Sequence, residues 1–208
     1  MILMNDFKAE PPELREAMLQ ATSRVLESGW YVLGSEVKQF EQQWSRVCGV
    51  SHGIGVANGM DAIEIAILGL SIGEGDEVIT TPMTAFATIL AIIRSGAKPV
   101  LADIDLETAL LSTESVRRCL SPKTKAIVLV HLYGQVRQMD KWVKFCEENK
   151  IILIEDCAQA HLATWQGKVS GSFGQAGAYS FYPTKNLGAV GDAGMLVTSD
   201  STLAKKDR

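Results

Sequence analysis

Apolar positions in the first fifty residues recur at helical spacing. Between Pro12 and Gly29 they lie three or four residues apart, at Leu14, Met18, Ala21 and Val25. A second series precedes Gly49, at Val37, Phe40, Trp44 and Val47. A stripe with this period covers one face of a helix. We therefore expect amphipathic helices over residues 12–28 and 35–48.

Beyond residue 50 the pattern becomes one of short, continuously apolar runs separated by segments of helix length. The runs are GIGVA, EVIT, KPVLADI, AIVLVHLY, IILIED, GAYSFY and GMLVT, at 53–57, 77–80, 98–104, 126–133, 151–156, 177–182 and 194–198. The helical segments between the first five cover 61–70, 85–94, 113–119 and 139–149. Such alternation predicts one α/β domain with a mainly parallel sheet between helices. Ligands of such domains bind at the carboxyl ends of the strands.

Composition narrows the class of protein. The 208 residues are 47% hydrophobic and 21% charged, which is ordinary for a globular domain. A net charge of -4 lacks the basic excess that nucleic-acid binding requires. The four cysteines occur singly, without a CxxC pair, and no apolar run reaches the roughly 18 residues of a membrane span. We expect a cytoplasmic protein with neither nucleic acid nor a membrane as partner.

The first candidate for ligand binding follows the strand GIGVA. Gly59 and Met60 open a helix there, and a helix N-terminus presents free N–H groups that favour an anion. A plain strand-to-helix turn is the alternative interpretation. The overlapping GIGVANG is not a dinucleotide fingerprint, because its glycines are spaced GxGxxxG and two of them lie within the strand.

The second candidate is the pair of carboxylates that ends the strand IILIED. At least one of Glu155 and Asp156 should emerge at the ligand-binding edge of the sheet. Two acids that cap the next helix, or a metal site formed by Asp156 with His131 and His161, are alternatives. We expect no metal, because no pair of these ligands has metal-binding spacing.

The third candidate is SFYPTKNLG, in which Ser180 and Lys185 follow another strand. A single lysine in a loop is usually a solvated surface group. An anion site, a carboxylate and a lysine at one sheet edge nevertheless meet the needs of pyridoxal 5'-phosphate. That cofactor requires a lysine for its aldehyde, an acid for its pyridine nitrogen and donors for its phosphate.

These motifs also carry a family resemblance. EDCAQAH, SFYPTKNLGAVGDAG, VHLYGQ and GWYVLG with EVKQFE resemble the DegT-type nucleotide-sugar aminotransferase family of fold-type I pyridoxal phosphate enzymes, over essentially the whole chain. The resemblance implies an aspartate aminotransferase-like large domain over 1–208, with a sheet of the seven-stranded type. Family members are nearly twice as long, so we expect the small C-terminal domain to be absent. A homodimer with shared active sites is also implied.

The resemblance assigns roles to the site residues. Lys185 would hold the cofactor as a Schiff base and then carry the proton, which makes it the catalytic residue. Asp156 would pair with the pyridinium nitrogen, Gln159 would lie against the ring near its phenolic oxygen, and Ser180 would bind phosphate. Relatives that are dehydratases have histidine in place of this lysine. Because this sequence has Lys185, it resembles the transaminating branch of the family. The implied reaction passes an amino group, usually from L-glutamate, to a nucleotide-linked keto-sugar, here a dTDP-3-keto-6-deoxyhexose.

Several positions depart from the family pattern. The backbone amides of Gly59 and Met60 would join the phosphate site, but Met60 replaces the usual threonine. Ala85 stands where the family has a ring-stacking aromatic, so Phe86 would cover the ring or the stacking would be weaker. Leu162 replaces a common glycine near the sugar pocket. Met60 and Ala85 favour the alternative of a regulatory relative that binds the cofactor without turnover.

Overall fold

The computed structural model describes residues 5–206, which fall into two compact units divided after Phe40. The first unit contains η1 (Phe7–Ala9), α1 (Pro12–Ser28) and the start of α2 (Ser35–Cys48). α1 begins at a proline, whose missing N–H is not needed there, and ends at Gly29, whose φ of 64° suits the left-handed region. Both helices expected in this part of the sequence are present. Three positions of the apolar stripe of α1, Met18, Ala21 and Val25, are half-buried.

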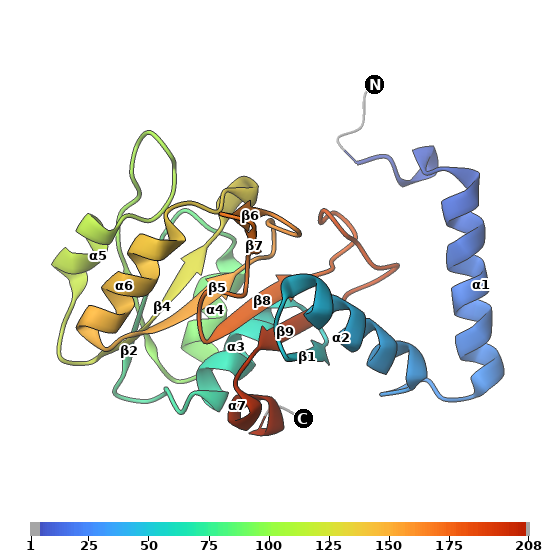
Figure 1. The fold of residues 1–208 in the computed structure, drawn as a ribbon, viewed down its shortest axis with the longest axis horizontal. Helices are drawn as coiled ribbons and strands as arrows, with labels where there is room; N and C mark the ends of the chain where they lie inside the picture. The colour runs from blue at the N-terminus through green and yellow to red at the C-terminus, as the bar shows by residue number, and fades with distance from the viewer. Residues whose placement is uncertain (1–4, 207–208) are drawn as a thin grey trace. The chain divides into compact units, whose positions relative to one another are not determined.

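A seven-stranded sheet organises the second unit (Figure 1), in the order β1-β9-β8-β5-β4-β2-β3. The strands are β1 (His52–Val56), β2 (Glu77–Thr80), β3 (Lys98–Leu101), β4 (Thr124–Val130), β5 (Ile152–Asp156), β8 (Ala176–Ser180) and β9 (Gly194–Thr198). The five strands from β3 to β8 in this order are parallel, and β9 runs antiparallel to both β8 and β1. The prediction of a mainly parallel α/β sheet is confirmed.

Helices cover both faces of the sheet. α3 (Gly59–Gly69), α4 (Phe86–Arg94) and α7 (Ser201–Lys206) share one hydrophobic core with it, and α5 (Thr113–Cys119) and α6 (Met139–Asn149) share another. Ala126 and Val128 of β4 belong to the first core, and Ile127 and Leu129 belong to the second. Burial on both faces explains why the strands read as continuous apolar runs.

The element boundaries differ from those expected in a few places. β4 ends at Val130, because a short 3-10 helix, η2 (Leu132–Gly134), follows it. Tyr133 within η2 has non-helical backbone angles. α3 begins at Gly59, two residues earlier than expected, because the Asn58 side chain caps its first turn. The hairpin of β6 (Thr164–Trp165) and β7 (Lys168–Val169) was not predicted, since two-residue strands are too short to show a period. Among residues 5–206, no helix has both the length and the apolar character needed to cross a membrane.

The topology gathers the candidate groups at one edge of the sheet. β1 is antiparallel to β9, and β9 is antiparallel to β8, so β1 and β8 run in the same direction. The carboxyl ends of β1, β2, β5 and β8 therefore lie at the same edge. The turn before α3, the start of α4, Asp156 and the segment after Ser180 all follow those strand ends.

Candidate active site

A cavity of about 410 Å³ opens at this edge of the sheet. Its walls come from the turn before α3, the start of α4, the end of β5 and the segment after β8. Six predicted site residues line it: Gly59, Met60, Ala85, Asp156, Ser180 and Lys185. Phe86 does not line it and is 68% exposed. Gln159 lines a second cavity of about 400 Å³, which shares Thr184 and Lys185 with the first.

The first cavity contains a helix N-terminus with free donors. The Asn58 Oδ1 atom accepts from the Asp61 N–H at 2.9 Å, whereas the N–H groups of Gly59 and Met60 have no partner within the helix. A Cβ atom on Gly59 would lie only 2.6 Å from the Ser180 Cβ atom. Glycine therefore lets the start of α3 approach the end of β8. The Ser180 Oγ atom accepts from the Tyr182 N–H at 3.3 Å, which leaves its hydroxyl hydrogen free to donate to an anion.

Asp156 is held by two hydrogen bonds inside the first cavity. Thr88 Oγ1 donates to Asp156 Oδ2 at 2.8 Å, and the Ala158 N–H donates to Oδ1 at 3.1 Å. Thr84 Oγ1 in turn lies 2.8 Å from Thr88 Oγ1. The sequence interpretation did not select Thr88. No local pattern indicated it, because Thr88 lies in α4 whereas Thr84 precedes the helix.

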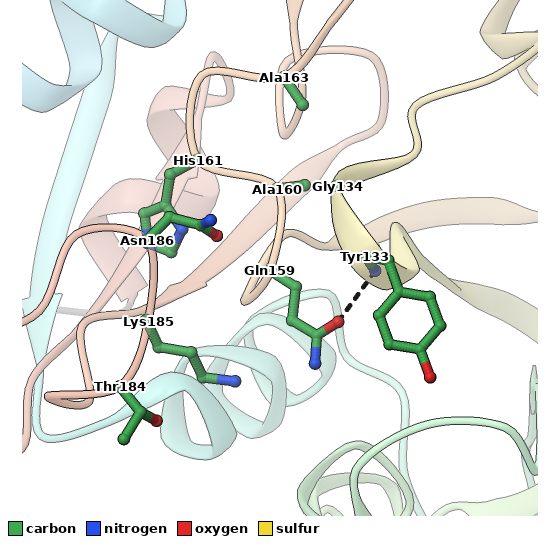
Figure 2. Close-up of a pocket in the computed structure, with 9 residues that line it drawn as sticks. All are labelled: Tyr133, Gly134, Gln159, Ala160, His161, Ala163, Thr184, Lys185 and Asn186. Atoms are coloured by element: carbon green, nitrogen blue, oxygen red, sulfur yellow. Dashed lines mark hydrogen bonds between the residues drawn. The ribbon is translucent and has the colours of Figure 1, made fainter. Parts of the chain in front are cut away.

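Lys185 lies in a tight turn between the two cavities. Its N–H donates to the Tyr182 carbonyl at 2.8 Å, and the Ala189 N–H donates to the Phe181 carbonyl at 2.7 Å. Gly188 is required by close packing, because a Cβ atom there would lie 2.4 Å from the Pro183 carbonyl oxygen. The half-buried Lys185 side chain therefore extends from a fixed backbone. Figure 2 shows its amine and the Gln159 amide reaching into the same space.

His161 lies beside this turn in an aromatic cluster. Its ring centroid is 5.8 Å from that of Trp44, 5.5 Å from Tyr179 and 5.4 Å from Phe181. Burial lowers the pKa of His161 and outweighs the Ser180 carbonyl and the Asn186 side chain, which raise it. Neither of these neighbours has hydrogen-bond geometry to the buried ring nitrogens. The imidazole is therefore neutral near neutral pH.

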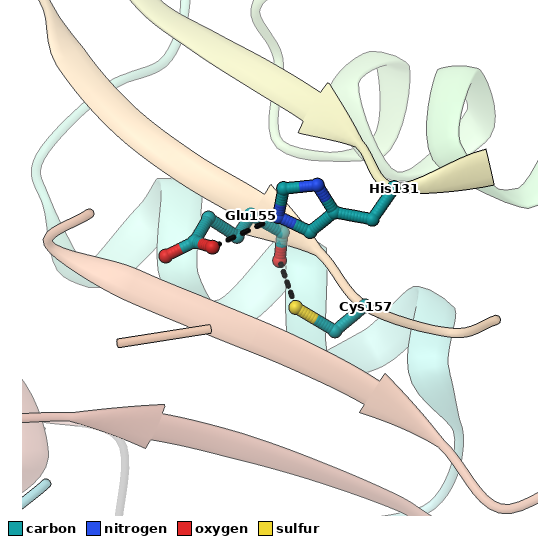
Figure 3. Close-up of side chains that lie close together, drawn as sticks. All are labelled: His131, Glu155 and Cys157. Atoms are coloured by element: carbon teal, nitrogen blue, oxygen red, sulfur yellow. Dashed lines mark hydrogen bonds and ion pairs between the residues drawn. The ribbon is translucent and has the colours of Figure 1, made fainter. Parts of the chain in front are cut away.

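His131, Glu155 and Cys157 form the one cluster of potential metal ligands found within residues 5–206 (Figure 3). Both Glu155 oxygens are already engaged by hydrogen bonds. Oε1 accepts from the N–H groups of Phe173 at 2.7 Å and Gly174 at 2.8 Å. Oε2 lies 2.8 Å both from the Gly171 nitrogen and from His131 Nε2.

These hydrogen bonds indicate that the cluster stabilises the fold and does not bind a metal. Four partners use the lone pairs that Glu155 could offer a metal. Burial, followed by the charges of Glu155 and Asp156, raises the pKa of Cys157 well above its usual value, which disfavours the thiolate that a metal needs. The alternative ligand set of His131, Asp156 and His161 is not a cluster within the described part of the chain.

Comparisons with known proteins identify the family of the chain. Residues 12–208 match the family model described as the DegT/DnrJ/EryC1/StrS aminotransferase family. The chain is 45% identical over 206 residues to dTDP-3-amino-3,6-dideoxy-alpha-D-galactopyranose transaminase of Aneurinibacillus thermoaerophilus, covering 99% of this chain and 57% of the relative. It is 43% identical over 205 residues to the "Pleiotropic regulatory protein" of Geobacillus stearothermophilus, covering 99% and 55%.

A solved structure of an S. venezuelae protein has the same fold as this chain. The S. venezuelae DesV structure, in complex with a ketimine intermediate, superposes with a TM-score of 0.94 at 41% identity. That superposition covers 98% of this chain and 55% of DesV. The chain thus spans about half the length of the relatives that it matches.

Proposed function

Because the chain belongs to the DegT/DnrJ/EryC1/StrS aminotransferase family, we propose that its protein moves an amino group from an amino acid to a nucleotide-linked keto-sugar. Members of the family use pyridoxal 5'-phosphate. The observation that carries the proposal is the first cavity, where Lys185, Asp156, Ser180 and the Gly59 turn meet. Within this proposal, residues 1–208 form the cofactor-binding large domain of a cytoplasmic homodimer.

The residues of the cavity fit this cofactor. The N–H groups of Gly59 and Met60 at the start of α3 and the Ser180 hydroxyl suit its phosphate, in a cradle that a side chain at Gly59 would fill. The Asp156 carboxylate, buried but accessible from the cavity, suits a protonated ring nitrogen. When bound, the cofactor supplies an electron sink for the carbon that carries the transferred amino group. Lys185 would hold the aldehyde and carry a proton at its amine, and the Asp156 carboxylate would keep the ring nitrogen protonated.

The finer substrate assignment is also proposed. We take L-glutamate as the donor and a dTDP-3-keto-6-deoxyhexose as the acceptor. The name of the Aneurinibacillus relative, dTDP-3-amino-3,6-dideoxy-alpha-D-galactopyranose transaminase, supports this acceptor.

At the cofactor site, Ala85 provides no aromatic side chain to stack on the cofactor ring, and Phe86 lies outside the cavity lining.

Two measurements on the full-length protein test the proposal. Borohydride reduction of the cofactor-loaded protein, followed by peptide mapping, should place the label on Lys185, and Lys185→Ala is the matched control. Label on another lysine contradicts the assignment. L-glutamate alone should then convert the bound cofactor to its pyridoxamine form, as seen by absorbance. A protein that is labelled at Lys185 but never converts is the regulatory alternative.

A further inference from the structure

The turn after β4 carries a strained residue at the edge of the second cavity. Tyr133 has φ 56° and ψ 25°, the left-handed conformation that a residue with a Cβ atom adopts at a cost of roughly 1 to 2 kcal/mol. Its side chain is 69% exposed, so burial of the phenol ring does not offset this cost. Backbone strain of this kind persists where the surrounding structure fixes it, and it concentrates at functional sites.

Buried contacts on the N-terminal side of Tyr133 fix the turn. The His131 N–H donates to the Asp156 carbonyl at 3.0 Å, and His131 Nε2 lies 2.8 Å from Glu155 Oε2. The next residue, Leu132, is also buried. The structural cluster around Glu155 (Figure 3) therefore anchors the start of the turn at the carboxyl end of β5.

The turn directs one donor toward Gln159. The Tyr133 N–H donates to Gln159 Oε1 at 2.9 Å, as Figure 2 shows. A side-chain amide has an acceptor end and a donor end, so occupation of Oε1 leaves Nε2 for the cavity. Within residues 5–206, Nε2 has no hydrogen-bond partner, and it points into the space that Lys185 also reaches.

We propose that the turn from His131 to Gly134 is a positioning device for Gln159. Its Tyr133 N–H fixes the amide so that Nε2, the donor, faces an oxygen acceptor on a ligand bound beside Lys185. The positive end of the amide dipole then lies near Lys185, which favours a neutral amine and an anionic ligand oxygen. The identity of the ligand rests on the proposed function, whereas the contact between Tyr133 and Gln159 does not.

The contact can be tested without cofactor. Hydrogen exchange of the Tyr133 amide, followed by NMR, should be roughly tenfold faster in Gln159→Leu than in the unchanged protein, because the bond that protects it is lost. The Leu side chain matches glutamine in size but accepts no hydrogen bond. Equal exchange in the two proteins would overturn the proposal, whatever the cofactor does.

A matched pair of variants tests the effect on the cavity. Tyr133→Gly and Tyr133→Val both remove the phenol ring, but only glycine adopts the left-handed conformation readily, and a β-branched residue resists it. The readout is the pKa at which the visible absorbance of bound pyridoxal phosphate changes. An amide donor stabilises the deprotonated, more negative state, so its loss raises this pKa.

We expect Tyr133→Val to raise the pKa by about one unit and Tyr133→Gly to leave it unchanged. Equal shifts would assign the effect to the phenol ring, and no shift would mean that the amide is not presented by the turn; either result overturns the proposal. If Tyr133→Val does not fold, Tyr133→Asn and Tyr133→Thr give the same contrast, because asparagine tolerates this conformation and threonine does not. Failure of the unchanged protein to bind the cofactor would refute the proposed function, and the exchange result would still decide the contact.

Discussion

Glu155 and Asp156 are adjacent carboxylates at the end of β5, and they have opposite surroundings. Glu155 is fully buried and accepts three backbone N–H groups as well as contacting His131. Asp156 accepts from Thr88 and the Ala158 N–H, and it lines the first cavity. Successive residues of a strand point to opposite faces, so one carboxylate enters the protein interior and the other faces the ligand space.

This difference separates a structural carboxylate from one available to a ligand. All the acceptor capacity of Glu155 is used within the protein, so its charge stabilises the fold. Asp156 keeps acceptor capacity for a donor that enters the cavity, such as a protonated ring nitrogen. Loss of charge at Asp156 should therefore reduce activity, and loss of charge at Glu155 should reduce stability.

The largest expected effect is the loss of activity in Asp156→Asn. Asparagine keeps the size of the side chain but cannot hold a ring-nitrogen proton by charge, so single-turnover transamination in the full-length protein should fall by about 10³, equivalent to ~4 kcal/mol. The free energy of unfolding should change by less than about 1 kcal/mol. Unchanged transamination would remove Asp156 from its proposed role.

Glu155→Gln should reduce the stability of the protein and largely keep its activity, the reverse of Asp156→Asn. Whichever way the new amide turns, its NH₂ group faces at least one backbone N–H that formerly donated to a carboxylate oxygen. We expect the free energy of unfolding to fall by roughly 3 kcal/mol in urea denaturation, because this environment is buried. The folded fraction should keep transamination within about tenfold of the unchanged protein. A stable Glu155→Gln protein with greatly reduced activity would reverse the comparison.

A smaller effect is expected where Asp156 contacts the protein. Thr88→Val keeps the shape of the buried side chain but leaves Asp156 Oδ2 without its donor, so we expect a loss of about 1.5 kcal/mol without cofactor. Thr88→Ser should retain most of the stability. Thr84→Val is the matched control, because Thr84 contacts Thr88 and not Asp156. Equal losses at both threonines would show that the hydroxyl chain, rather than the bond to Asp156, determines the effect.

The sequence predicted those parts of the site that depend on residues close together in the chain. Strand ends and their shared edge can be deduced from apolar runs, which is why Lys185 and Asp156 were expected together. The bond from Thr88 to Asp156 joins residues 68 positions apart, and no local pattern specifies its register. The strand pattern predicted only that at least one of Glu155 and Asp156 would emerge at this edge, and it was the family resemblance that selected Asp156. The left-handed Tyr133 was read as part of a strand, because buried contacts from distant residues impose its conformation.

The smallest expected effect concerns His161, which differs from His131 in its partners. His131 contacts Glu155, whereas the buried nitrogens of His161 have no hydrogen-bond partner in the described structure. Burial places the folded-state pKa of His161 below its ordinary value of 6.5. As the pH falls below 6.5, the unfolded chain therefore binds a proton that folded His161 does not, and stability decreases until the folded-state pKa is passed.

His161→Phe should remove this component of acid destabilisation. Phenylalanine fills the aromatic cluster, so the free energy of unfolding near neutral pH should not decrease, and the curve of unfolding temperature against pH should flatten below 6.5. The difference from the unchanged protein should be smaller than the loss in Thr88→Val, because His161 is only partly buried. Subtracting the two curves isolates the contribution of His161. Parallel curves would show that His161 takes up its proton equally in both states, and that its contacts with the Ser180 carbonyl and Asn186 balance the burial.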